Sequence, residues 1–227
     1  MKPDRAVIEL PPDLVRDCDQ WGHWIVAHYA GGGSSQSRAF SSHGAENNPV
    51  LQSNSKIAEC IFALHMNMDP RQAVRSSLES WDIKVGQTLV DVKRTELDNK
   101  FLIWPINKNP IYATKHFHVL ALVKTASQRD AGGAAINASG YVRGWIGKRS
   151  FAARRQIAGP AHKLTEGTWH MHEDLLHRVG IFPGLSDDWR EHYCHCGEWG
   201  AFGFNVSLRK GQLGTWYCAE HNRRTVR

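Results

Sequence analysis

The stretch TLVDVKRTE, residues 88–96, alternates in a way that predicts a β-strand at the centre of the fold. In such a strand Val90 and Val92 share one face, while the charged Asp91 and Lys93 share the other. An ionised side chain on a buried face is costly unless a partner neutralises it. If that face is buried, the charges of Asp91 and Lys93 therefore need a partner.

Other strand-like runs lie on both sides of this stretch. WDIKV (81–85) precedes it across a Gly-Gln turn. KFLIWPI (100–106), HFHVLALVK (116–124) and YVRGWIG (141–147) follow it, and the small-residue segment before the last of these is expected to be a loop. Helices followed by a run of short strands favour an α/β or α+β fold with a central mixed sheet flanked by helices.

Helical spacing of apolar residues predicts one helix over 11–29 and a second over 55–68, and a short third helix is expected at 170–178. The intervening residues 30–55 are dense in Gly, Ser and Asn, which is typical of a long loop or lid. We expect three parts, namely an N-terminal helix and loop at 1–50, a core at 51–188 and a small module at 189–227.

The composition narrows the class of protein. A chain of 227 residues with 41% hydrophobic residues and nine Trp can build a substantial core. The net charge of +6 favours a polyanionic partner, with nucleic acid ahead of an anionic membrane. The sequence has no signal-peptide pattern and no apolar run near the roughly 18 residues that span a bilayer, so we expect a cytoplasmic protein without a membrane partner.

Carboxylates in and around the strand make a candidate metal site. The Gly-Gln turn would bring Asp82 beside Asp91, and a pair of carboxylates at adjacent strands suits Mg²⁺ or Mn²⁺. Ser55 lies four residues before Glu59, so a capping box does not explain Glu59, and an inward-facing glutamate is the remaining interpretation. The alternative is that the charged residues form surface ion pairs and that Glu59 is exposed.

The order of Glu59 on a helix, then Asp82, then the triplet Asp91-Val92-Lys93 resembles the PD-(D/E)XK nuclease superfamily. The resemblance spans about residues 50–150, and YVRGWIG looks like the later core strand of many phage and restriction-type members. The chain departs from the pattern in having Trp rather than Pro before Asp82, and Asp rather than the commoner Glu at the head of the triplet.

The resemblance implies a restriction-endonuclease-like core that hydrolyses DNA phosphodiesters with Mg²⁺ or Mn²⁺ and leaves 5′-phosphate and 3′-hydroxyl ends. Asp82 and Asp91 would bind the ion together with the Val92 carbonyl. Glu59 would support the metal or its water, and Lys93 would orient or activate the attacking water. Many members of the superfamily act as dimers, so a homodimer is compatible with the resemblance. The chemistry fits independently, because a divalent ion both polarises water and neutralises phosphoryl oxygens.

The C-terminal segment has a different metal signature. Cys194-x-Cys196 and Cys218-x-x-His221 are separated by 21 residues, and this spacing is typical of a structural zinc site built around a hairpin. FGFNVSL and GTWYC are predicted to form that hairpin. Another histidine near YCHC could replace one ligand, and buried free thiols are the alternative. Because the segment is too small for a core of its own, we expect its fold to depend on Zn²⁺.

A basic stretch follows the predicted sheet. No acidic residue occurs between Ala131 and Thr165, whereas six cations do. A DNA backbone could run along this stretch with an affinity that falls as salt rises, and a solvated basic face is the alternative. The residues predicted to contact nucleic acid are Thr95, Arg143, Lys148, Arg149, Arg154, Arg155, Arg209 and Lys210.

These features leave two classes of function. The first is a metal-dependent nuclease that acts on DNA, or on RNA with the same site. The second is a zinc-stabilised DNA-binding or recombination accessory protein whose acidic cluster is structural. The second class predicts salt-sensitive binding to nucleic acid without metal-dependent turnover.

Overall fold

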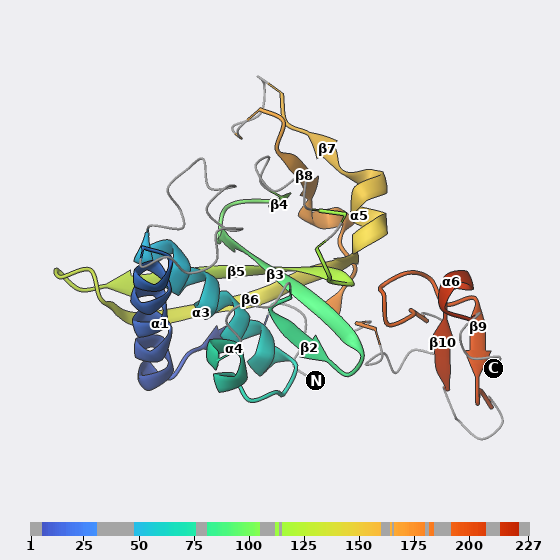
Figure 1. Cartoon of the computed structure of the whole chain (residues 1–227), viewed down its shortest axis with the longest axis horizontal. Coiled ribbons are helices and arrows are strands. Elements are labelled where there is room, and N and C mark those ends of the chain that lie inside the picture. The colour runs from blue at the N-terminus through green and yellow to red at the C-terminus, as the bar shows by residue number, and fades with distance from the viewer. Residues whose placement is uncertain are drawn as a thin grey trace.

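A mixed five-stranded sheet in the order β1-β6-β5-β3-β2 forms the centre of the molecule (Figure 1). The computed structural model describes residues 6–30, 48–75, 81–104, 112–113, 115–159, 164, 166–179, 182–183, 192–207 and 214–222. Strand β3 pairs in parallel with β5, and the other neighbours in this sheet pair antiparallel. The mixed sheet is therefore confirmed. The strands are β1 (Ile8–Glu9), β2 (Ile83–Val85), β3 (Thr88–Glu96), β5 (Val119–Arg129) and β6 (Ala135–Gly147).

Helices cover one face of this sheet and a second, smaller sheet covers the other (Figure 1). The first layer consists of α1 (Pro12–Ala30), α3 (Pro49–His65) and α4 (Arg71–Arg75). The opposite layer is the three-stranded sheet β4-β8-β7 with α5 and a 3₁₀ helix, η3. Its bounds are β4 (Phe101–Trp104), β7 (Gln156–Ile157), β8 (Trp169–His172), α5 (Lys148–Arg154) and η3 (Glu173–Leu175).

The alternation within β3 follows from these two layers. Val90 and Val92 belong to the apolar core beneath the helices. Asp91 lies opposite Leu120 of β5, which belongs to the apolar core on the other face. Asp91 is only 1% exposed. The charged face of the strand is therefore buried at Asp91, and the alternative of surface ion pairs is wrong for this residue.

Two elements begin earlier than expected from the sequence. Helix α3 begins at Pro49 rather than Ser55, because the side chain of Asn48 caps it by accepting hydrogen bonds from the first free backbone amides. Strand β6 begins at Ala135, so most of the predicted small-residue loop before YVRGWIG is strand. The tight turn before it is stabilised by Asp130, whose carboxylate accepts from two backbone amides. Of the predicted loop at 30–55, residues 31–47 lie outside the described residues.

The short helix expected at 170–178 is wrong. Its first residues form β8, which pairs with both β4 and β7, and only η3 follows as a single 3₁₀ turn. The alternating sequence WHMH places Met171 in the core and fits a strand once partners are present on both sides. The run KFLIWPI likewise gives β4, which pairs with β8 and is not part of the central sheet.

The C-terminal segment forms a small module beside the core (Figure 1). Strands β9 (Phe202–Phe204) and β10 (Thr215–Tyr217) pair antiparallel, which confirms the predicted hairpin. One helical turn, α6 (Ala219–Asn222), follows β10. Within the described part of the chain, no helix combines the length and apolar character needed to cross a membrane.

Candidate metal sites at the β3 edge and in the C-terminal module

The β2–β3 hairpin places Asp82 beside Asp91, as predicted. Gly86 has φ +57° in the turn, a left-handed conformation that glycine adopts without steric cost. Regular pairing ends where Ile83 faces Val90. Beyond this pair, the Asp82 side chain continues the hydrogen bonding to β3, because its Oδ2 accepts a hydrogen bond of 2.7 Å from the Val92 amide. Asp82 is thus fixed against the edge of β3.

This arrangement also orients the Val92 carbonyl. The N–H and C=O of one residue in a paired strand point to the same side. Because the Val92 amide points to Asp82, its carbonyl points to the same edge. Two of the three predicted metal-binding groups therefore lie at the edge of β3 where β2 ends.

Two lysines surround the carboxylate of Asp91. Lys93 Nζ lies 2.7 Å from Asp91 Oδ2, and Lys115 Nζ lies 2.9 Å from Asp91 Oδ1. Burial alone would raise the pKa of Asp91, but these two ammonium groups overcome it and hold the pKa below its usual range. Two cations therefore neutralise Asp91, and the sequence did not reveal one of them, Lys115.

Glu59 points inward from α3, and the idea that it is exposed is wrong. It is 6% exposed and pairs with Lys56, whose Nζ lies 2.5 Å from Glu59 Oε2. Lys56 also donates to the Ala73 carbonyl at 3.0 Å. Burial first and then the nearby negative charge of Asp82 raise the pKa of Glu59 well above its usual range. Lys56 is a second lysine that the sequence did not mark.

The pKa of Asp82 is raised as well, first by burial and then by Asp91. This mutual repulsion connects Glu59 with Asp82 and Asp82 with Asp91. The structure therefore brings the predicted residues Glu59, Asp82, Asp91 and Lys93 into one electrostatic cluster and adds Lys56 and Lys115 to it. We call these six residues the β3-edge cluster.

The oxygens of the β3-edge cluster are of the type that Mg²⁺ and Mn²⁺ prefer. Among the described residues, however, the three carboxylates do not form a group close enough to surround one ion. Both oxygens of Asp91 already have an ammonium group at hydrogen-bond distance. The donor chemistry fits a hard divalent ion, but an ion at Asp91 has to compete with two ammonium groups.

The described residues do contain a prepared site in the C-terminal module. All four predicted ligand atoms, from Cys194, Cys196, Cys218 and His221, lie within 4.8 Å of one another. The Sγ atoms of Cys196 and Cys218 are 3.7 Å apart, and zinc–sulfur bonds in a tetrahedral site place sulfurs at about 3.8 Å. His221 Nδ1 lies 3.4 Å from Cys194 Sγ and 3.2 Å from Cys218 Sγ. The group fits a structural zinc ion.

Two tight turns set the ligand geometry. The Cys194 carbonyl accepts from the Gly197 amide at 2.8 Å, with Gly197 at φ +82°. The Cys218 carbonyl accepts from the amides of His221 and Asn222 as α6 begins. Both ligand pairs are therefore held by local backbone hydrogen bonds, which explains why their spacing could be read from the sequence.

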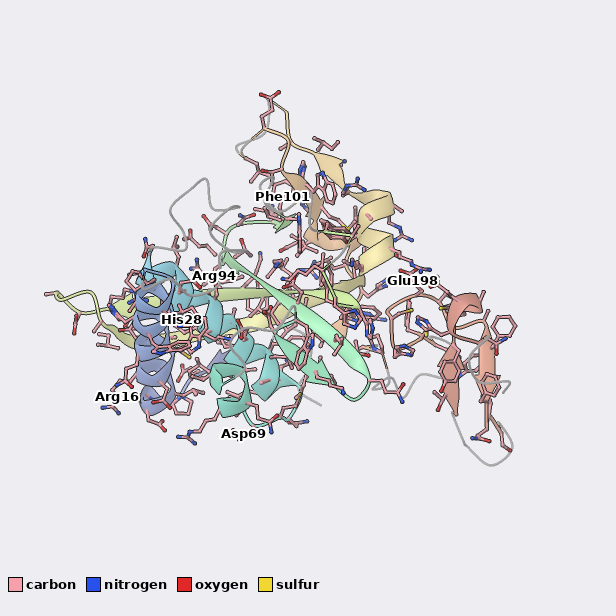
Figure 2. The ribbon with its side chains drawn as sticks, viewed as in Figure 1. Arg16, His28, Asp69, Arg94, Phe101 and Glu198 are labelled. Atoms are coloured by element: carbon pink, nitrogen blue, oxygen red, sulfur yellow. The ribbon has the colours of Figure 1, made fainter. Side chains whose placement is uncertain are left out.

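The module docks on the core close to the β3-edge cluster. Thr88, the first residue of β3, donates its hydroxyl to the His195 carbonyl at 2.9 Å. Glu198 lies where the module meets α5 (Figure 2), and it accepts from the amide and hydroxyl of Ser150. The ring of His118 lies 5.3 Å from that of His195, and its Nδ1 accepts from the Leu89 amide at 3.1 Å. The module thus contacts the beginning of β3 through a hydrogen bond and ring packing.

A cleft of about 460 Å³ lies between the module and the core. Its aromatic wall is Tyr112 and Phe117, and its cations are Lys148 and Arg149. Lys148 Nζ donates to the backbone carbonyl of Lys115 at 2.6 Å, so the cleft adjoins the β3-edge cluster.

The predicted nucleic-acid contacts are in several environments. Arg143 is held by Glu173 and Asp174, and Arg155 lies 3.8 Å over the ring of Trp169. Arg154 is exposed. Of the others, Thr95 is buried, Arg149 pairs with Glu220, Lys148 lines the cleft, and Arg209 and Lys210 lie outside the described residues.

Comparisons of the chain with protein-family models, curated proteins and solved structures found no match.

Proposed function

We propose that the chain is a metal-dependent nuclease of the PD-(D/E)XK type that hydrolyses DNA phosphodiester bonds. The observation that carries this proposal is that Asp82 and the Val92 carbonyl lie at one edge of β3, next to Asp91 in the same strand, whose carboxylate has Lys93 Nζ at 2.7 Å. Glu59, which is buried on α3, interacts electrostatically with Asp82. A structural ion-pair network has no need to gather these carboxylates in one place, where they repel one another.

The proposed reaction assigns a role to each group. Asp82, Asp91 and the Val92 carbonyl would hold Mg²⁺ or Mn²⁺, which supplies a polarised water and neutralises charge on the phosphate. Lys93 would orient or activate the attacking water and offset charge on the phosphate. The phosphorus–oxygen bond to the 3′ oxygen breaks, so the products carry 5′-phosphate and 3′-hydroxyl ends.

The basic surface and the cleft favour a polyanionic substrate. Arg154 on α5 is exposed, and Lys148 and Arg149 line the cleft beside the cluster. Tyr112 and Phe117 are themselves buried and give the cleft an apolar floor beneath these cations. These features support nucleic acid as the substrate, with DNA as the proposed form and RNA as the variant that shares the site.

A second candidate is a zinc-stabilised DNA-binding or recombination accessory protein without catalysis. Two observations favour it. Within the described residues the only prepared metal group is the Cys/His group, and the Asp91 carboxylate is already neutralised by Lys93 and Lys115. Under this alternative the β3-edge cluster is a buried ion-pair network that maintains the sheet.

Cleavage assays separate the two candidates. Circular and linear DNA, single- and double-stranded, would be incubated with zinc-loaded protein in Mg²⁺, Mn²⁺ or EDTA. The nuclease proposal predicts cleavage in Mg²⁺ or Mn²⁺ that is lost in Lys93→Ala and retained in Lys124→Met. Lys124 is a matched control because it also lies on a strand of the central sheet and pairs with a carboxylate, Glu173, at 2.7 Å. Binding without cleavage in every metal would favour the accessory protein.

A further inference from the structure

Lys115 is an unexpected partner of Asp91. It lies in the segment before β5 and outside the regular strands, yet its side chain is only 20% exposed. Its Nζ lies 2.9 Å from Asp91 Oδ1 and 5.6 Å from the centre of the Trp104 ring. Its carbonyl accepts from Lys148 Nζ at 2.6 Å. Lys115 is therefore positioned by packing and hydrogen bonding.

The two lysines on Asp91 come from different parts of the fold. Lys93 is part of β3, whose backbone is fixed by the register with β5. Lys115 belongs to a bend before β5, and its side chain joins that segment to Asp91. A lysine ammonium on a flexible stem can exchange one oxygen partner for another with little change in geometry. Because the proposed function assigns Lys93 to the attacking water, Lys115 is the lysine that can exchange partners.

We propose that Lys115 is an exchangeable counter-ion, which neutralises Asp91 in the metal-free protein and moves to a phosphate oxygen of bound nucleic acid when a divalent ion takes its place. This inference rests on the proposed function. A divalent ion and an ammonium group repel each other when both lie next to Asp91. The incoming phosphate carries the negative charge that the displaced ammonium needs, and it arrives at the same edge of β3.

The exchange couples the two ligands. Nucleic acid that draws Lys115 away makes Asp91 available to the metal, and the metal in turn releases Lys115 for the phosphate. Such coupling is reciprocal, so each ligand raises the affinity for the other by the same factor. Without nucleic acid the protein is then expected to bind the metal weakly, because the ion has to compete with the ion pair between Lys115 and Asp91.

The test measures Mn²⁺ affinity of the zinc-loaded chain by calorimetry, with and without a short phosphorothioate duplex that resists cleavage. In the wild type the duplex is expected to tighten Mn²⁺ binding about tenfold. Lys115→Met removes the ammonium and keeps most of the stem, so the duplex-free affinity is expected to rise about tenfold and the effect of the duplex to fall below about twofold.

Two variants show whether the effect is specific. Lys124→Met makes the same change at another buried, ion-paired lysine and is expected to keep wild-type Mn²⁺ affinity. Lys115→Arg keeps the charge and is expected to keep the coupling. Zinc content and the melting temperature of each variant establish that it is folded.

The proposal is overturned if Lys115→Met binds Mn²⁺ no more tightly than the wild type or retains the coupling to the duplex. Asp82→Asn distinguishes this result from a failure of the proposed function. The Asn side chain can still accept the hydrogen bond from the Val92 amide, but it loses the charge. If Asp82→Asn leaves Mn²⁺ affinity unchanged, the ion does not bind at the β3 edge, and both proposals fail.

Discussion

The β3 edge and the C-terminal module differ in how far their ligands are prepared for a metal. In the module, thiolate and imidazole atoms are already at the spacing of a closed zinc site. At the β3 edge, the central carboxylate of Asp91 is occupied by two ammonium groups. The Cys/His group can close around an ion as it is, whereas an ion at the β3 edge has to compete with the internal ion pairs of Asp91.

This difference matches the two roles that we assign. A structural ion needs a full shell of protein ligands and gains from having them fixed. A catalytic ion has to admit water and substrate, so ligands that exchange partners are suited to it. The module then supports catalysis indirectly, by holding the beginning of β3 through Thr88.

The largest expected effect is on stability at the β3 edge. Asp91→Ala leaves the ammonium groups of Lys93 and Lys115 without their carboxylate in a largely buried place, which is expected to cost about 3–5 kcal/mol. Urea unfolding of the zinc-loaded protein measures it. Adding Lys115→Met to Asp91→Ala should restore part of the loss, because one unpaired charge is removed. A loss below about 1 kcal/mol would show that these pairs behave like exposed surface pairs.

The module is expected to respond to a different change. Cys218→Ser removes one of the four ligands, so zinc content should fall from roughly one ion per chain to almost none. The amides of Gly197 and His221, which the ligand turns protect, should then exchange with solvent much faster. Asp82→Asn serves as the control and should keep its zinc. A Cys218→Ser protein with wild-type zinc content would contradict the assigned ligand set.

A smaller effect tests the link between the two regions. Thr88→Val removes the hydroxyl that bonds the His195 carbonyl and is expected to cost about 0.5–1.5 kcal/mol. It should also speed the release of zinc to a chelator. Thr125→Val is the matched control, because Thr125 is another buried strand threonine whose hydroxyl accepts from Arg94, within the core. If both variants release zinc at the same rate, the Thr88 hydrogen bond does not link the zinc site to the β3 edge.

The smallest effect concerns the basic surface. Arg154 is exposed, so Arg154→Ala should reduce the slope of log affinity against log salt by about 0.9 for duplex DNA. Arg143 is bound to Glu173 and Asp174, and Arg143→Ala should leave the slope unchanged. Fluorescence anisotropy over a salt series gives both slopes. If Arg143→Ala reduces the slope and Arg154→Ala does not, the DNA runs across β6 and not along α5.

Features that depend on local pattern could be predicted from the sequence. The alternation of residues 88–96 and the Gly-Gln turn predicted the β2–β3 hairpin and the proximity of Asp82 and Asp91. The spacing of the Cys and His residues predicted the ligand group of the module, because each pair is closed by its own turn. In both cases the deciding contacts lie within a few residues of one another along the chain.

Features that depend on distant partners could not be predicted. Lys115 reaches Asp91 only because β5 pairs in parallel with β3 after a long connection that includes β4. Lys56 could have been noticed three residues before Glu59, but many helices carry such a pair on an exposed face. The strand character of WHMH became clear only with β4 and β7 on either side. The contact of Lys115 with Asp91 and the strand character of WHMH both depend on pairing between segments that are far apart in the sequence.

The most direct test of the central claim is the cleavage of DNA by wild-type protein and by Asp82→Asn at matched zinc content, in Mg²⁺ and in EDTA. The variant keeps an acceptor for the Val92 amide, so it is expected to fold with its zinc in place. We predict Mg²⁺-dependent cleavage by the wild type and a loss of at least about a hundredfold in Asp82→Asn. Equal cleavage by both proteins, or cleavage that persists in EDTA, would contradict a catalytic metal at the β3 edge.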